Sequence, residues 1–258
     1  MKRYFSPSVV EPAAKPKSNS LFQPSSIQEQ VVYNRAFQSV IWGMPAVNYD
    51  LMLQEMLTKT SAKQNEVVYW SQPVDWHNQT LTPNPDAIYF MIFFNTKEAG
   101  PVVIEVPPAE GGSSFAANID SVFQMPLEDA GPYGADKGAG GKYLILPPAY
   151  DQKPPEGYIV LNADTYEGYG LFRSNLPSHS DADVAKAVTY GKRLKVYLLS
   201  NAENPGETKF TDAKEVLYDA TIPYDIRFFR SLDRIVQSQP WLTRDKVMID
   251  QLKTIGIE

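Results

Sequence analysis

Apolar residues recur at helical spacing near the amino-terminal end of the chain. Ser26-Ile-Gln-Glu29 has the form of a capping box, in which the serine and glutamate satisfy backbone N–H groups at a helix start. The i, i+3, i+4, i+7 pattern of a buried helix face follows at Phe37, Val40, Ile41 and Met44. Gly43-Met-Pro45 predicts an interruption, because proline lacks a backbone donor and restricts the residue before it. We therefore predict two helices, the second over about 46–57.

The pattern changes at Glu66 to short apolar runs separated by proline, glycine and asparagine. Seven of these runs are predicted to be strands, because turn residues divide them at short intervals. They are Glu66–Trp70, Ala87–Asn95, Pro101–Val106, Ser114–Phe123, Lys142–Leu146, Gly157–Asn162 and Gly168–Arg173. The connections look too short for parallel crossovers, so the pattern predicts an antiparallel sandwich.

Helical spacing returns after Asp181. One helix is predicted from there to about residue 200, with apolar residues at Val184, Val188, Leu194, Val196 and Leu198. Two more are predicted over Tyr224–Gln237 and Thr243–Thr254, separated by Gln239-Pro240. The result is a β-rich α+β fold in which helices from both ends of the chain flank a sandwich. Its expected parts are a weakly ordered tail (1–25), a helical segment (26–60), a β-sandwich (61–178) and a second helical segment packed on it (179–258).

Composition and charge narrow the classes of function. The 258 residues include 24 Lys and Arg against 30 Asp and Glu, so the net charge of −6 disfavours nucleic-acid binding. There is no cysteine, which excludes disulfides, zinc–thiolate sites, iron–sulfur clusters and cysteine nucleophiles. With only two histidines, His77 and His179, a three-histidine metal site cannot form within the chain, and we assign no metal ligands and no cofactor. No apolar run approaches the ~20 residues of a transmembrane helix. No signal peptide is evident either, because the residues after Met1-Lys-Arg3 are polar rather than apolar.

An aromatic segment at Trp70–Asn78 is the first candidate site. It holds Trp70, Trp76, His77 and Asp75 within nine residues. Aromatic surfaces beside polar groups suit ring-shaped or sugar-like ligands, and a histidine near a carboxylate can act as a general base. The alternative is a loop that packs its aromatic side chains on the domain.

A rigid turn before an apolar strand is the second candidate. Thr82-Pro-Asn-Pro-Asp86 holds two prolines, and the side chains of Asn84 and Asp86 can bind neighbouring amides. We interpret it either as a structural turn or, together with Tyr89, as the lining of a ligand site. The glycine-rich run 134–143 does not match a phosphate-binding loop, because Asp136 and Tyr143 stand where glycine and Ser or Thr are required. No G-x-S-x-G motif supports a serine nucleophile.

These segments together resemble the family called domain of unknown function 1254. The motifs that carry the resemblance are Ile41-Trp-Gly-Met-Pro45, Pro83-Asn-Pro-Asp-Ala-Ile-Tyr89, Gly100-Pro-Val102, Asn118-Ile-Asp120, Gly140-Gly-Lys-Tyr-Leu-Ile145 and Ala163-Asp-Thr165 to Arg173. Their order and spacing match over about 35–256. The chain departs from the family at Ala87, Tyr169 and Phe172, where threonine, tryptophan and glycine are usual.

The resemblance implies an immunoglobulin-like or jelly-roll sandwich with a helical subdomain, in agreement with the pattern above. It also implies an extracytoplasmic location and a second β domain, called domain of unknown function 1214, that usually follows near the end of this chain. It implies no activity, because fold alone does not supply one.

Three functions follow as hypotheses. The first is a non-catalytic domain that binds a small molecule through Trp70, Trp76, His77, Asn84, Asp86 and Tyr89, or that is accessory to a second domain. The second is a hydrolase-like enzyme with His77, Asp86 and Asp120 as acid–base groups and Arg173 as an anion clamp. The third is a homo-oligomeric structural protein.

Overall fold

The computed structural model describes residues 22–80, 82 and 84–258. Its α-helices are α1 (Ile27–Lys59), α2 (Asp181–Gly191), α3 (Ile226–Ser238) and α4 (Lys246–Thr254), with short 3-10 turns η1 (Leu199–Asn201) and η2 (Thr243–Asp245). Its strands are β1 (Val67–Tyr69), β2 (Asn78–Gln79), β3 (Ala87–Asn95), β4 (Val102–Val106), β5 (Phe115–Ser121), β6 (Pro126–Ala130), β7 (Gly141–Leu146), β8 (Ile159–Asn162), β9 (Glu167–Asn175), β10 (Lys195–Leu198), β11 (Phe210–Asp212) and β12 (Tyr218–Asp219). The mixture of helices and several sheets confirms the predicted α+β class.

Two sheets share one hydrophobic core. The larger has the order β11-β1-β3-β9-β5-β6 and the smaller the order β10-β4-β7-β8, while β12 and β2 form a separate pair. Apolar side chains from both sheets meet between them, among them Phe90 and Phe172 from the larger and Ile104 and Tyr143 from the smaller. Whether these packed sheets are an immunoglobulin-like or a jelly-roll sandwich stays a prediction.

Three strand pairs are parallel, which corrects the expectation of a purely antiparallel arrangement. They are β1 with β11, β7 with β8, and β2 with β12. Strands β7 and β8 are consecutive, and the 12 residues between them are enough for a parallel crossover, so the short-connection argument was wrong for this pair. Strands β11 and β12 come from the carboxyl-terminal part of the chain, more than a hundred residues after their partners, so no tight crossover restricts their direction.

The predicted break in the first helix is wrong, because α1 runs without interruption through Pro45. An interior proline costs a helix about 3 kcal/mol. Packing on two sides offsets that cost here. Met52 and Met56 are fully buried against the larger sheet, each contributing roughly 1.5–3 kcal/mol. On the other side Gly43 lies so close to α3 that an added Cβ would stand 2.7 Å from a methyl carbon of Leu232.

The predicted helix to about residue 200 is also wrong, because α2 ends at Gly191. A Cβ at Gly191 would stand 2.0 Å from the ring of Phe90, so the chain turns where the helix meets the core. The residues that follow form β10, which pairs antiparallel with β4 from Lys195↔Glu105 to Leu198↔Val102. Val196 and Leu198 therefore belong to a strand, and pairing with the sheet edge overrides their helical spacing.

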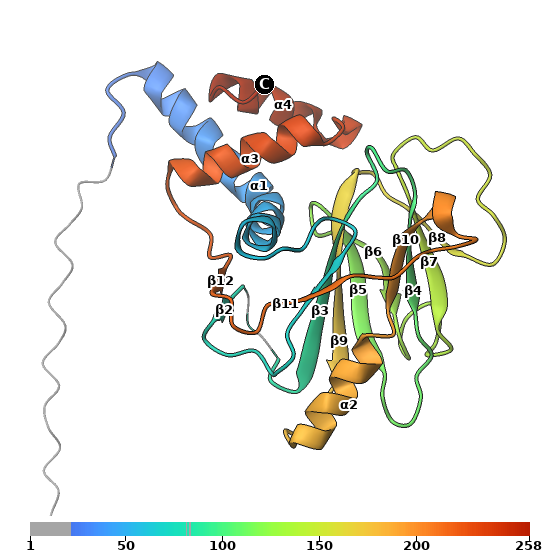
Figure 1. The fold of residues 1–258 in the computed structure, drawn as a ribbon. Coiled ribbons are helices and arrows are strands. Elements are labelled where there is room, and N and C mark those ends of the chain that lie inside the picture. The colour runs from blue at the N-terminus through green and yellow to red at the C-terminus, as the bar shows by residue number, and fades with distance from the viewer. Residues whose placement is uncertain (1–21, 81, 83) are drawn as a thin grey trace, which may run out of the picture.

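Helices α1, α3 and α4 form a second layer beside the sheets, whereas α2 packs at another end of the sheets, against the core between them (Figure 1). Helix α1 covers part of the outer face of the larger sheet, where Tyr49 packs on Phe93 and Tyr169. Helices α3 and α4 pack on α1 through a separate cluster that contains Val47, Leu232 and Leu252. Among the described residues, no helix combines the length and the apolar character that a membrane crossing requires.

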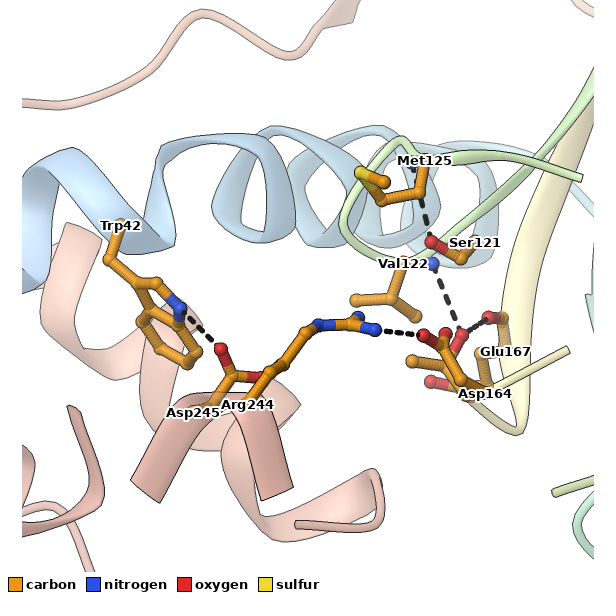
Figure 2. Close-up of polar contacts among 9 residues, drawn as sticks. Trp42, Ser121, Val122, Met125, Asp164, Glu167, Arg244 and Asp245 are labelled. Atoms are coloured by element: carbon orange, nitrogen blue, oxygen red, sulfur yellow. Dashed lines mark hydrogen bonds and ion pairs between the residues drawn. The ribbon is translucent and has the colours of Figure 1, made fainter. Parts of the chain in front are cut away.

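Polar contacts tie the end of this helical layer to the sheets (Figure 2). The indole N–H of Trp42 on α1 donates to Asp245 at 3.1 Å, and the guanidinium of Arg244 pairs with Asp164 at 2.5 Å, just before β9. These contacts join α1, η2 and the β8–β9 connection.

Candidate functional site

A cavity of about 90 Å³ lies where α1 stops covering the larger sheet. Strands β3 and β9 form its floor, since Tyr89 pairs with Arg173 and Met91 with Leu171, and alternate residues of a strand share a face. The lining comes from α1, from the residue that follows β1, from β3 and β9, and from four residues of the 74–82 segment: Met52, Trp70, Val74, Asn78, Thr80, Thr82, Tyr89, Met91, Tyr169, Leu171 and Arg173. Segments far apart in the sequence therefore meet around one hollow.

The cavity has a closed apolar end and a polar mouth. Met52, Trp70, Met91 and Tyr169 are each at most 4% exposed, and they mark the closed end. Tyr89 and Arg173 are half-buried and Thr82 is exposed, so the lining reaches solvent on that side. A ligand would thus present its polar part to Arg173 and its apolar part to the buried side chains.

Arg173 has unused hydrogen-bonding capacity at the mouth. Its Nη1 donates to Oδ1 of Asn118 at 3.1 Å, and its guanidinium carbon lies 5.9 Å from the centre of the Tyr89 ring. None of the ion pairs formed by the described residues includes Arg173. A guanidinium carries five N–H donors, so most of them remain available to an anion.

Asp120 lies beside the cavity on β5, opposite Tyr169 in the register. Its carboxylate accepts hydrogen bonds from the side-chain amide of Asn118 and from the hydroxyl of Tyr169. Burial raises the pKa of Asp120, and Asp129 adds to the rise, while these hydrogen bonds and Arg173 oppose it. Burial and Asp120 likewise raise the pKa of Tyr169 above its usual range. A chain of polar groups thus runs from the mouth to the buried end of β5.

Two buried polar atoms of the lining residues lack a partner among the described residues. They are the indole N–H of Trp70, whose side chain is 2% exposed, and the hydroxyl of Thr80. A buried donor without an acceptor costs about 1–3 kcal/mol. Water or a ligand in the cavity would relieve that cost, because both residues line it.

The other predicted site residues lie outside this lining. Trp76 is 67% exposed and stacks on His77, with ring centres 3.7 Å apart. His77 Nδ1 lies 2.8 Å from Asp75, and the backbone N–H and ring of His77 lower the pKa of that carboxyl. His77 and Asp75 line a neighbouring hollow of about 40 Å³ that also touches Trp70.

The turn before β3 has the hydrogen bonds that its composition suggests. The side chain of Asn84 accepts from the backbone N–H of Asp86 at 2.9 Å, and the Asn84 N–H donates to the hydroxyl of Tyr89 at 2.7 Å. The Asp86 carboxylate faces His179 at 3.1 Å, on the exposed surface. The structure therefore brings Trp70, Tyr89 and Arg173 together around the cavity with Asp120 beside them, and it places His77, Trp76 and Asp86 in other contacts.

Sequence reasoning missed several residues of the site. They are Met52, Asn78, Thr80, Met91, Asn118, Tyr169 and Leu171. The signal that could have found some of them is the period of two in β3 and β9, which puts Tyr89, Met91, Leu171 and Arg173 on one face. Both faces of β3 are buried, so hydropathy alone did not show which face carries the cavity.

A larger and open groove of about 1140 Å³ lies between β10 and β11, and five cationic and three acidic side chains line it. Lys195 pairs with Glu105 at 2.9 Å and Lys209 with Glu66 at 3.3 Å. Lys63 and Lys192 also line the groove and form no ion pair among the described residues, but the groove is open, so water screens its charges more than it screens Arg173 beside the small apolar hollow. Nowhere in the described ranges do three or more His, Asp or Glu side chains gather as a metal site.

The comparison with protein families bears on the strands that build the cavity. The family described as "Protein of unknown function (DUF1254)" matches residues 64–198, just over half of the chain. The chain belongs to this family. The matched residues include β1, β3, β5 and β9, so the sheet part of the cavity lies within the DUF1254 region. Its helical cover, from α1, lies outside it.

One solved structure supports the fold. The VPA0106 protein of Vibrio parahaemolyticus is similar with a TM-score of 0.61 at 16% identity, over 88% of this chain and 52% of that one. The chain thus spans about half the length of that relative. An uncharacterised protein from Burkholderia cenocepacia matches at a TM-score of 0.35 and 10% identity, over 81% of this chain and 56% of that one. No curated protein matches the chain.

Proposed function

We propose that this DUF1254 protein binds a small organic molecule in the cavity between the larger sheet, α1 and the 74–82 segment. The observation that carries the proposal is Arg173, a half-buried guanidinium that forms no ion pair among the described residues, at the mouth of an apolar hollow. Only one hydrogen bond, to Asn118, uses its N–H donors, so the guanidinium offers a place for an anionic group beside the cavity.

The scaffold supports this role because the binding groups sit on paired strands. Tyr89 and Arg173 face each other across β3 and β9, which pair over nine residues from Ala87↔Asn175 to Asn95↔Glu167. Side chains on such strands hold their positions better than side chains on loops. The cavity is therefore preformed on its floor, which lowers the entropy cost of binding.

Titration with small acids tests the proposal, with binding monitored through changes in the backbone amide signals of the protein. We expect cavity residues to shift in the wild type and the response to be lost in Arg173→Gln, since the guanidinium is the anion contact. Arg193→Gln is the control for loss of an arginine, because Arg193 is exposed, lies outside the cavity lining and pairs with Glu110 at 2.8 Å. Identical responses of wild type and Arg173→Gln, with both proteins folded, would contradict the proposal.

A hydrolase-like reaction is the second candidate, and the buried Asp120 beside Tyr169 and Arg173 is the observation that favours it. Its carboxyl would serve as the acid–base group, since burial raises its pKa and so favours the protonated form that a general acid needs. His77 and Asp86 would not take part in this form, because they contact Asp75 and His179 instead. Loss of turnover of ester or glycoside substrates in Asp120→Asn, with retention in His77→Ala, would support it.

Location and partners are proposed on the family resemblance. We propose an extracytoplasmic location and a second β domain or a second copy as partner. An exposed apolar stripe on α1 supports a partner, with Tyr33, Phe37 and Ile41 exposed by 48%, 59% and 63%. Cell fractionation tests the location. Light scattering tests self-association, and a strict monomer at high concentration would contradict the proposal that a second copy is the partner.

A further inference from the structure

The cavity also indicates what kind of molecule it takes. We infer that the ligand is a short monocarboxylate of about four carbon atoms that carries a hydroxyl or carbonyl at the end remote from the carboxylate. This inference rests on the proposed binding function. It is assembled from the charge at the mouth, the size and lining of the hollow, and the unpartnered donor at its closed end.

The charge at the mouth favours a carboxylate with a single negative charge. The planar fork of Arg173 suits carboxylate and phosphate alike. The two differ in what else they meet, because the carboxyl of Asp120 lies on the neighbouring strand and interacts with Arg173. A phosphate dianion would face roughly twice the repulsion from Asp120 that a monocarboxylate faces. The side-chain oxygen of Asn118 next to the guanidinium likewise limits the space for a second charged oxygen.

The size and lining of the hollow set the body of the ligand. An apolar protein cavity of about 150 Å³ accommodates benzene, with six carbon atoms, so about 90 Å³ accommodates about four non-hydrogen atoms. Met52, Met91 and Leu171 surround that space. A free inorganic anion would leave these walls without a partner, whereas a short carbon chain attached to the carboxylate would cover them.

The closed end requires a hydrogen-bond acceptor. The indole N–H of Trp70 can only donate, and in the described residues it has no acceptor. Its ring is held in place by an edge-to-face contact with Tyr218, with centres 5.3 Å apart, so it cannot turn to solvent without losing that packing. The hydroxyl of Thr80, which both donates and accepts, is unpartnered as well. A hydroxyl on the ligand would accept from Trp70 and donate to Thr80.

A pair of isosteric acids tests this inference. Pentanoate and 4-hydroxybutanoate have the same number of non-hydrogen atoms and differ only in a terminal methyl or hydroxyl. We expect 4-hydroxybutanoate to bind at least about tenfold more tightly in calorimetry, since pentanoate leaves the Trp70 donor buried and unpaired. It should also shift one of the four indole N–H signals, assigned to Trp70 by its absence in Trp70→Phe.

Trp70→Phe should reduce the preference between the two acids to less than about threefold while both still bind. Trp241→Phe, in the helical layer and 46% exposed, is the matched control and should keep the preference. Arg173→Gln should weaken both acids by about tenfold or more. Pentanamide, which has no charge, and inorganic phosphate, which has no carbon chain, should bind the wild type at least tenfold more weakly than 4-hydroxybutanoate.

The outcomes separate the inference from the binding function. An equal affinity for pentanoate and 4-hydroxybutanoate, or a preference that survives Trp70→Phe, would overturn the inference that the ligand carries an acceptor for Trp70. Binding of phosphate or pentanamide as tight as that of the acids would overturn the inference that the ligand is a monocarboxylate. In both cases, signals from cavity residues would still move and the proposed function would stand. If no compound of any class moved those signals, the binding function itself would be refuted, and this inference with it.

Discussion

The contact between α1 and α3 allows a quantitative test of the interactions that stabilise the helical layer. Asp50 is 2% exposed, and its carboxylate accepts from Arg234 at 2.5 Å, from Gln54 at 3.2 Å and from the hydroxyl of Ser231. Arg234 itself is 49% exposed. The two partners are therefore not equivalent, because only the carboxylate is taken fully out of water.

This asymmetry determines the size of the effect. Removing one partner of a buried ion pair costs about 3–5 kcal/mol, but water screens the exposed side of Arg234, so we expect Arg234→Ala to cost about 2–3 kcal/mol. Asp50→Asn should cost about 1–2 kcal/mol. The side-chain oxygen of the new asparagine still accepts a hydrogen bond from Ser231 or Gln54, and the half-exposed Arg234 turns to solvent. In the double variant no buried charge is left, so the two costs should not add, with a coupling of about 1 kcal/mol or more.

Urea unfolding followed by circular dichroism measures these free energies as shifts of the transition midpoint. The matched control is Arg230→Ala, since Arg230 is an exposed arginine on the same helix and should change stability by less than about 0.5 kcal/mol. A loss in Arg234→Ala no larger than in the control, or additive losses in the double variant, would refute the reasoning.

Other expectations concern the sheet face and the core. Asp120→Asn should flatten the pH dependence of stability. The pKa of Asp120 is raised in the folded state, so the folded state holds the proton more tightly, and wild-type stability falls as the pH rises from about 4 through the folded pKa. A parallel fall of stability in the variant would contradict this. Gly191→Ala should destabilise by about 1–3 kcal/mol in thermal or urea unfolding, because its Cβ would stand 2.0 Å from the buried ring of Phe90, and an unchanged midpoint would show that this ring moves freely. Trp76→Ala should leave stability within about 0.5 kcal/mol and leave acid binding unchanged, since Trp76 is 67% exposed and lies outside the cavity lining; weaker binding would place the ligand in the aromatic segment instead.

Long apolar runs with clear boundaries were predictable from the chain alone. The strand over Ala87–Asn95 has the predicted bounds, because nine residues rich in isoleucine, phenylalanine and tyrosine follow a proline turn. The helix predicted over Tyr224–Gln237 corresponds to α3 (Ile226–Ser238), where Asp225 caps the first turn. In these segments propensity, periodicity and turn residues all favour the same structure.

Segments whose state depends on distant partners were not predictable. Pro45 predicts a break, yet burial of α1 between the larger sheet and α3 keeps the helix continuous. Residues 195–198 have helical spacing, yet they pair with β4 and form a strand. Strand β11 is three residues long and pairs parallel with β1, a contact between segments more than a hundred residues apart.

The same division holds for the candidate site. By itself the sequence determined the types of side chain that are available: no cysteine, two histidines, an aromatic segment and an arginine at the end of an apolar strand. Only the tertiary structure decided that Arg173 meets Tyr89 and Trp70 around one cavity, while His77 meets Asp75 and Asp86 meets His179. The physical reason is that a strand gives each residue a face, but the register with its neighbours and the helix packed above it decide which face is left open.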